Sequence, residues 1–409
     1  MSAAVHRDWS GLPEDLMLIV MRALAIPDLL RAGAVCVSWR AASADVRRIQ
    51  FPITDASPCL LYTCAADADD TATVYSVSTG ALFKVRLPPS AAPFRSRHVV
   101  GSGHGWVVTA DDAPRFQALN PLTGAQVDLP PVKGLDDVNI FSADQARLQR
   151  PGEIWRYIYL AYLSCSPANG SACAILLVHQ CSGYLYFTHV GDDRWTKITT
   201  QNTSLQLDIC FHSAVYNQND GLFYVLSFNS SVFALDLSGP SPTTVRTVFT
   251  GREEVVLEWL GYKHGPRGNI ILTPWGDILQ VWRSKRRYML NTLIFNIPES
   301  FIDDILLCKV DIHEKRLVRI SGEDLRGHAL FLCFNASMCL STKDFPGLKP
   351  NCAYVTNGSW RQVFITKFGS QEVGIWNFET KILESLGKVQ SDHPWLDWPS
   401  PIWITPSLS

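Results

Sequence analysis

The sequence predicts a small all-α module followed by a large all-β propeller of about six to eight blades. Apolar residues recur at helical spacing within the first fifty residues, whereas the remainder alternates short apolar runs with turns rich in Gly, Asn, Asp, Ser and Pro. Charged residues make up only 18% of the chain and aromatic residues 11%, which suits a β-rich interior. We therefore divide the chain into a helical module, residues 1–50, and a propeller, residues 51–409.

The N-terminal module is predicted to hold three short helices. The first is marked by apolar residues at helical spacing between Leu12 and Leu24, and Pro13 suits its first position, where no backbone N–H is needed. A second begins at Pro27-Asp28, and a third runs from Val35 towards Val46. Because three short helices bury little surface alone, we expect their remaining apolar face to lie against a partner.

Seven β-hairpins are predicted beyond Pro52. Their turns centre near residues 79, 123, 192, 230, 276, 335 and 379. Several of these intervals are close to the ~40–50 residues of a propeller blade, and longer ones indicate inserted loops. The absence of a long helical pattern between the strands argues against alternating β and α units. A two-sheet sandwich is the remaining all-β alternative.

A propeller must join its first and last blades or leave two open sheet edges. The segment Pro394–Pro399 is too aromatic and rich in proline for a free tail, and Ile402–Ile404 has strand character. We predict that this C-terminal segment packs on or pairs with the first β-segment, Cys59–Thr63.

Composition and charge limit the kinds of partner that the protein is expected to bind and the compartment in which it is expected to lie. Lys and Arg number 36 against 38 Asp and Glu, so no basic excess favours nucleic acid. The N-terminus lacks the apolar stretch of a signal peptide, and no apolar run reaches the ~18 residues of a membrane span. The 11 Cys are scattered without a C-x2-C pair, which predicts a disulfide-free propeller in a reducing compartment, cytoplasmic and/or nuclear.

Motifs of catalysis and cofactor binding are missing from the sequence. The run Gly101-x-Gly103-x-Gly105 has the wrong spacing for a dinucleotide site and reads as close strand packing. No phosphate-binding loop, metalloprotease motif or nucleophile elbow occurs, and no two His have metal-ligand spacing. We therefore predict no catalytic residue, no metal and no cofactor.

Two kinds of charged run remain to be placed. The aspartate pairs Asp111-Asp112, Asp136-Asp137 and Asp303-Asp304 are expected in loops, because neighbours on a strand point to opposite faces and cannot act together. The basic run Arg283–Arg287 is interpreted as a solvated hairpin loop; a nuclear-import signal or a substrate patch is the alternative.

Residues 12–42 resemble an F-box. The match comprises Leu12-Pro13, an apolar helix to Leu24, Pro27-Asp28-Leu29-Leu30, Val35-Cys36 and Trp39-Arg40, in the family's order and spacing. Ser38 departs from the pattern, since the family often has a basic residue there.

Most of the remaining chain resembles the propeller-type (kelch-related) domain of a large plant family of F-box proteins. The matching pieces are Gly103–Thr109, Asn120–Gly124, Leu129–Pro131, Asp193–Thr196, Ala329–Leu332, Asp344–Gly347 and Pro401–Pro406. The loop Ser321–His328 differs slightly from the family's charged loop.

These resemblances imply a substrate adaptor. F-box proteins dock on a Skp1-like protein within a cullin–RING ubiquitin ligase, and their C-terminal domain binds a protein substrate, which the sequence does not name. The residues that the resemblance assigns to Skp1 binding are Leu12, Pro13, Leu16, Ile19, Leu24, Leu29, Leu30, Val35, Cys36, Trp39 and Arg40. Two alternatives stay open: a propeller enzyme such as a glycosidase, and an F-box protein acting outside the ligase.

Overall fold

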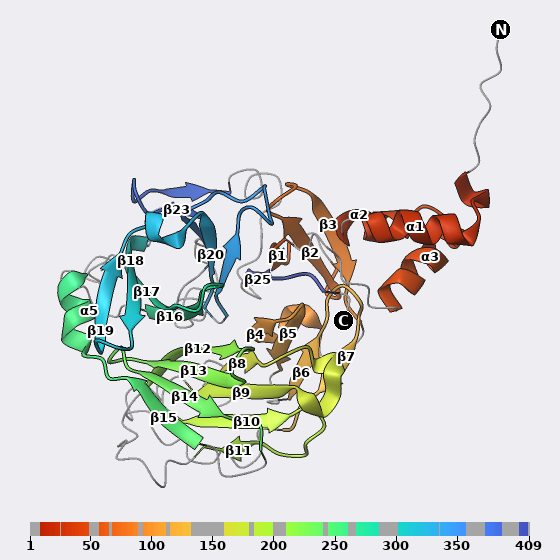
Figure 1. Ribbon diagram of the computed structural model, residues 1–409. Coiled ribbons are helices and arrows are strands. Elements are labelled where there is room, and N and C mark those ends of the chain that lie inside the picture. Colours follow the sequence, from red (N-terminus) through yellow and green to blue (C-terminus); the bar gives the residue numbers. More distant parts are fainter. Residues whose placement is uncertain are drawn as a thin grey trace, which may run out of the picture.

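Strands dominate the computed structural model of the chain and form a ring of sheets with a helical module at its side (Figure 1). The residues that the structure describes are 9–24, 26–48, 57–64, 68–88, 93–111, 115–131, 159–179, 184–198, 210–239, 244–260, 267–285, 302–334, 336–356, 373–386 and 401–407.

The three predicted helices of the module are confirmed. A 3-10 turn, η1 (Trp9–Gly11), precedes α1 (Glu14–Ala23), α2 (Ile26–Ala32) and α3 (Val37–Arg48). Helix α1 begins one residue later than predicted, at Glu14, and Pro13 is its N-cap. The helices share a core of their own, formed by Met17, Met21, Leu29, Ala32, Ala42 and Val46.

The first sheet contains the predicted ring closure. It has the order β25-β1-β2-β3, with strands β25 (Ile402–Ile404), β1 (Cys59–Tyr62), β2 (Thr71–Ser76) and β3 (Leu82–Arg86). C-terminal β25 pairs antiparallel with β1, and Trp403 lies opposite Leu60. The prediction that the chain ends join is therefore confirmed for residues 402–404, whereas Pro394–Pro399 lies outside the described residues.

The second sheet is a pair of four-stranded units. Its order is β11-β10-β9-β8-β4-β5-β6-β7, and its strands are β4 (His98–Gly103), β5 (Trp106–Ala110), β6 (Phe116–Leu119), β7 (Gln126–Asp128), β8 (Tyr159–Leu163), β9 (Ala174–His179), β10 (Leu185–His189) and β11 (Thr196–Lys197). The units meet where β4 runs parallel to β8, with Gly101 opposite Ala161. A Cβ on Gly101 would collide with the Ala161 carbonyl oxygen, so the predicted role of this glycine in close strand packing is confirmed.

Two regular four-stranded antiparallel sheets follow. One contains β12 (Phe211–Asn217), β13 (Leu222–Ser227), β14 (Val232–Asp236) and β15 (Thr244–Phe249). The other contains β16 (Arg267–Leu272), β17 (Ile278–Lys285), β18 (Ile302–Asp311) and β19 (Arg316–Ile320). Both match the predicted hairpins. Helix α5 (Glu253–Trp259), which lies between these sheets in the sequence and at the outside of the ring in Figure 1, was not predicted.

The last sheet departs from the regular pattern. It has five strands in the order β21-β20-β22-β23-β24: β20 (His328–Leu332), β21 (Met338–Ser341), β22 (Cys352–Val355), β23 (Gly374–Asn377) and β24 (Leu383–Ser385). The two predicted hairpins are present, but β20 and β22 pair in parallel. Short 3-10 turns elsewhere are η2 (Phe94–Ser96), η4 (Pro167–Ala172) and η5 (Glu323–Leu325). The number of blades stays a prediction.

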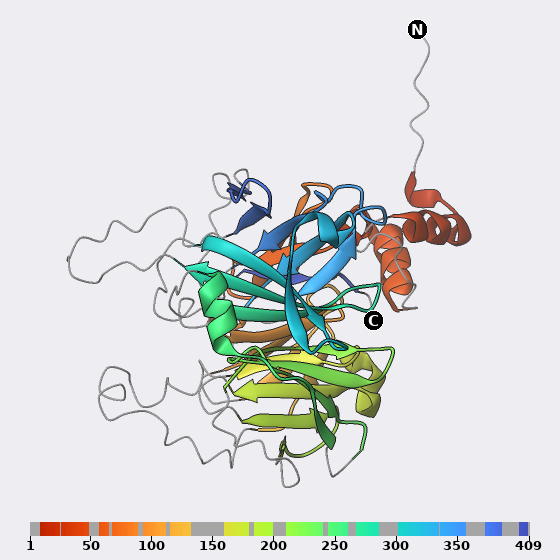
Figure 2. The ribbon, with the colours of Figure 1, turned by 60° about the vertical axis from the view of Figure 1, so that its left-hand side comes forward.

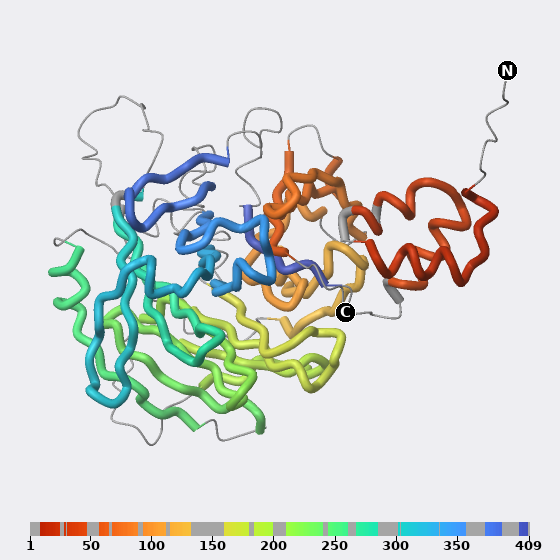
Figure 3. Tube along the Cα trace, turned by 45° about the horizontal axis from the view of Figure 1, so that its top comes forward, coloured from red at the N-terminus to blue at the C-terminus, as the bar shows by residue number. Residues whose placement is uncertain are grey.

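The helical module lies beside the outer strand of the first sheet (Figures 1 and 3). Arg31 on α2 donates a hydrogen bond from Nη2 to the carbonyl of Leu82 on β3, at 3.1 Å. Figure 2 shows the module at one side of the ring. The two parts therefore have separate cores and a polar contact between them.

The basic run at Arg283 was interpreted wrongly as a solvated loop. Arg283 lies on β17 and is only 1% exposed. Its guanidinium donates to the carbonyls of Thr356 and Cys333 at 2.9 Å each and to Asn269 Oδ1 at 3.0 Å. Sequence alone favours exposure for a run of cations. Here, however, the buried guanidinium is satisfied by backbone carbonyls at the ends of β20 and β22 in the five-stranded sheet and by Asn269 on β16. Arg286 and Arg287 lie outside the described residues.

Candidate protein-interaction site

The helical module exposes most of the large apolar side chains found at the surface of the described residues. Those on the module are Trp9, Leu16, Ile19, Val20, Val35 and Val37, and those elsewhere are Phe228, Ile312 and Ile382. A concentration of exposed apolar residues on one small module is characteristic of a protein-binding surface.

Helix α1 is apolar on two sides. Met17 and Met21, four residues apart, face the core of the module and are buried. Leu16, Ile19 and Val20 share a second face by their i, i+3 and i+4 spacing, and Ile19 is 60% exposed. A helix in an isolated soluble module needs only the first stripe. The second stripe is therefore available to a partner.

The turn at the N-terminus adds aromatic surface next to the start of α3. Trp39 donates from Nε1 to the carbonyl of Trp9 at 3.0 Å, and Ser38 donates to the carbonyl of Ser10 at 3.1 Å. These bonds fix η1 against α3, so the exposed Trp9 and Val37 belong to neighbouring parts of the module. Trp39 itself is half-buried against the module core.

The predicted docking residues divide by exposure. Exposed are Pro13, Leu16, Ile19, Val35 and Arg40, and half-buried are Leu12, Leu24, Cys36 and Trp39. Leu29 is a correction: it is fully buried in the module core and offers no surface for direct contact. The side chain of Leu30 lies outside the described residues.

Three exposed residues of this surface were not predicted. Val20 belongs to the helical repeat and could have been found by separating that repeat into an inner and an outer stripe. Trp9 and Val37 flank the helices in sequence, and no periodic signal marks them. We call the exposed set Trp9, Leu16, Ile19, Val20, Val35 and Val37 the apolar docking surface.

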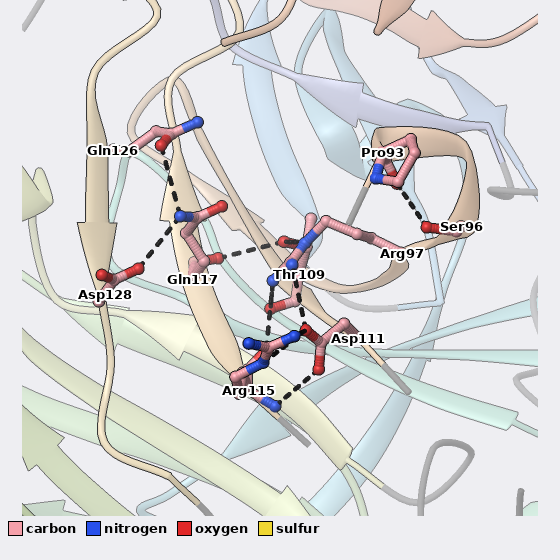
Figure 4. Close-up of polar contacts among 9 residues, drawn as sticks. All are labelled: Pro93, Ser96, Arg97, Thr109, Asp111, Arg115, Gln117, Gln126 and Asp128. Carbon is pink, nitrogen blue, oxygen red and sulfur yellow. Dashed lines mark hydrogen bonds and ion pairs between the residues drawn. The ribbon is translucent and has the colours of Figure 1, made fainter. Parts of the chain in front are cut away.

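A second candidate site is a polar hollow of about 530 Å³ on the unit β4–β7 (Figure 4). Asp111, directly after β5, is 3% exposed and accepts from Arg115 Nε at 2.8 Å. Arg97 is 4% exposed and lies 3.7 Å from the same carboxylate oxygen through Nη1. The hollow thus has two guanidiniums grouped around one buried carboxylate.

Burial and charge act in opposite directions on the Arg97 guanidinium. Desolvation is the largest cause and lowers the pKa of Arg97, and the like charge of Arg115 lowers it further, while the carboxylates of Asp111 and Asp128 raise it. Arginine stays protonated even so. A fixed cation therefore forms part of the floor of the hollow.

A larger hollow, of about 660 Å³, lies between the fourth and fifth sheets. Lys381 pairs there with Asp304 on β18 at 2.8 Å. Asp303-Asp304 therefore lies on a strand rather than in the predicted loop, because β18 is longer than the apolar run suggested. Asp112 and Asp136-Asp137 lie outside the described residues.

Several further features bear on the sequence predictions. No group of three or more acidic, His or Cys side chains that could hold a metal occurs within the described parts of the chain. None of the ten described cysteines is in a disulfide, and Cys181 lies outside this set. Across the described residues, no helix is long and apolar enough to cross a bilayer.

Two family models match this chain and together define its class. Residues 9–49 match the F-box-like family model, and residues 74–377 match the model of the KIB1-4 beta-propeller. The chain is thus an F-box-like module joined to a β-propeller. Because the second match covers well over half of its length, the chain belongs to the KIB1-4 β-propeller family.

The chain is similar to several F-box proteins of Arabidopsis thaliana. The chain is 23% identical to F-box protein At2g05970 over 98% of its own length and 97% of that protein. It is 22% identical to F-box protein SKIP23 over 97% and 96%. Identity to F-box/kelch-repeat protein At1g57790 is 27%, over 56% of each chain.

A solved β-propeller domain, Cps50 (Swd1) of Myceliophteria_thermophila, also aligns. It covers 81% of this chain and 86% of its own, with 9% identity and a TM-score of 0.34.

Proposed function

We propose that this protein is a substrate-recognition adaptor of an SCF (Skp1–cullin–F-box) ubiquitin ligase. F-box proteins are in general adaptors of this kind rather than enzymes. In this proposal the helical module docks on a Skp1-like protein, and the propeller binds the protein to be ubiquitinated. A cytoplasmic and/or nuclear location follows from the same proposal.

The observation that carries the proposal is the apolar docking surface. The helices of the module already form a hydrophobic core of their own. Helix α1 nevertheless presents a second apolar stripe, Leu16, Ile19 and Val20, to solvent. Burying such a stripe in a partner contributes about 25 cal/mol per Å² of apolar area. Central apolar anchors of this kind dominate the binding energy of an interface.

Replacing Ile19 by Glu tests the docking surface. Ile19 is 60% exposed, so the folded module should tolerate the change, whereas a charge buried without a partner in the interface should weaken Skp1 binding by at least about tenfold. Ile382 on the propeller is 58% exposed and supplies the matched control, Ile382→Glu. Binding of a Skp1-like protein to the full chain is measured by calorimetry or surface plasmon resonance.

A double change of Leu12 and Pro13 to Ala provides a milder second test. It should weaken Skp1 binding by about 1–2 kcal/mol, as expected for apolar anchors near the interface centre. The assignment is wrong if Ile19→Glu and the double variant both bind as the unmodified chain does, or if Ile382→Glu weakens binding equally.

A further inference from the structure

The polar hollow on β4–β7 is rigidly built around Arg97 (Figure 4). Its Nε donates to Thr109 Oγ1 at 2.7 Å, and Nη2 reaches the carbonyls of Thr109 and Arg115 at 3.4 and 3.2 Å. Its Nη1 lies 3.7 Å from the Asp111 carboxylate, beyond hydrogen-bond distance. One end of a buried guanidinium is therefore held in place while Nη1 keeps donor capacity.

Arg115 is held equally firmly but reaches solvent. Its Nε and Nη2 each lie 2.8 Å from Oδ2 of Asp111, and its backbone N–H donates to Oδ1 of the same residue at 3.0 Å. Its side chain is nevertheless 58% exposed. Asp111 thus fixes one side of this guanidinium, and Nη1 on the other side remains available to donate to an oxyanion.

The opposite wall of the hollow presents oxygen atoms. Gln117 donates from Nε2 to Gln126 Oε1 at 3.4 Å and to Asp128 Oδ1 at 3.1 Å. Those two bonds use both hydrogens of the amide. The side-chain amide oxygen of Gln117 and the exposed Asp128 carboxylate are then acceptors suited to backbone N–H groups.

We propose that this hollow is a target-recognition site that binds an oxyanion group, the carboxylate of an acidic residue or a phosphate on a modified one, within an extended segment of a protein. The oxyanion meets Arg97 and Arg115, and backbone N–H groups beside it meet Gln117 and Asp128. Strand β7 is an edge strand of its sheet, so an extended segment can lie along it. A hollow of about 530 Å³ is within the size range of specific ligand sites. This inference rests on the proposed adaptor function.

The experiment uses the full chain and synthetic peptides with randomised flanks and one fixed central residue. Four libraries carry Glu, phosphoserine, Gln or Lys at the centre, and captured peptides are quantified by mass spectrometry. We expect capture of the Glu or the phosphoserine library to exceed that of the Gln and Lys libraries by about tenfold or more, as a charged hydrogen bond provides. Preference between Glu and phosphoserine, and competition by inorganic phosphate, identify the source of the oxyanion.

Arg115→Ala should abolish that preference, because it removes the exposed guanidinium while Asp111 keeps Arg97 beside it. Arg115→Lys should restore it only in part, since an ammonium lacks the planar two-sided geometry. Arg86→Ala is the matched control: Arg86 is an exposed arginine on β3 that pairs with Asp70 at 2.8 Å. Equal capture of all four libraries, a preference unchanged in Arg115→Ala, or equal loss in Arg86→Ala would overturn the proposal.

Failure of this site and failure of the adaptor function give different results. Arg115→Ala should bind a Skp1-like protein normally, and Ile19→Glu should keep the peptide preference. If peptides are selected through Arg115 while no variant of the docking surface changes Skp1 binding, the recognition site stands and the adaptor function fails.

Discussion

The closure of the ring by the C-terminal strand yields the prediction with the largest expected effect on stability. Trp403 on β25 is 1% exposed, and its ring packs edge-on against Phe331 at 5.3 Å and Tyr354 at 6.2 Å between ring centres. Replacing Trp403 by Ala removes these contacts and leaves a cavity. For a fully buried Trp this costs about 3–5 kcal/mol of unfolding free energy.

Removing the whole segment 394–409 should be more damaging. Besides Trp403, the deletion exposes the partners of Ile402 and Ile404, which are 1% and 2% exposed. At about 1.5–3 kcal/mol for each buried Ile, the total loss is about 6–11 kcal/mol. Because entire domains are stable by only ~5–15 kcal/mol, the truncated propeller should unfold, aggregate or become sensitive to protease.

The assay is urea unfolding followed by tryptophan fluorescence, with Trp9→Ala as the control. Trp9 is 58% exposed, so its removal should change the unfolding free energy by no more than about 0.5 kcal/mol. Skp1 binding should survive in Trp403→Ala, because the module has its own core. The reasoning is refuted if Trp403→Ala unfolds at the same urea concentration as the unmodified chain, or if the truncated chain stays soluble and melts unchanged.

Two further predictions concern packing and pH. Gly101→Ala should destabilise the propeller by about 1–3 kcal/mol, because the new Cβ collides with Ala161. Gly103→Ala is the control, since a Cβ there meets its neighbours only at ordinary contact distances. Equal melting temperatures of the two variants would contradict this prediction. Burial lowers the pKa of His179 to about 3 and that of His212 well below 6.5. The unfolded chain therefore binds more protons below about pH 6.5, and stability should fall as the pH drops from there, by up to about 1.4 kcal/mol per unit for each histidine. Urea titrations at about pH 7 and about pH 5.5 check this, and equal midpoints would count against it.

Local signals made most of the fold predictable. Each hairpin joins strands adjacent in sequence, and turn residues such as Thr79-Gly80 and Thr123-Gly124 mark its tip, where Gly80 and Gly124 adopt positive φ. Ring closure was predictable for a different reason, since a propeller cannot leave its first and last edges open. The parallel pairing of β20 with β22 carries no local signal, because it depends on segments that are not neighbours in the chain.

The candidate sites show the same contrast. The residues of the outer stripe of α1 lie within a single helical repeat of the sequence, so Leu16 and Ile19 could be found from their spacing alone. The polar hollow draws on Arg97 directly before β4, Asp111 directly after β5 and Arg115 directly before β6. Only the pairing of these strands brings the three side chains together. In the sequence each of them is an isolated charged residue, and hydropathy predicts that such a residue is exposed to solvent.

The closing strand also links the two candidate sites mechanically. It pairs with β1 in the sheet whose outer strand receives Arg31 of the helical module. Ser102 on β4 donates to the carbonyl of Trp403 at 3.1 Å, and Asn120 after β6 donates to the carbonyl of Ser407 at 3.0 Å. The C-terminal segment thus braces the unit that carries the polar hollow as well as the sheet beside the module. Loosening it should therefore weaken peptide recognition at the hollow before it affects Skp1 binding, because the hollow depends on strand register within the ring while the docking surface depends only on the helices' own core.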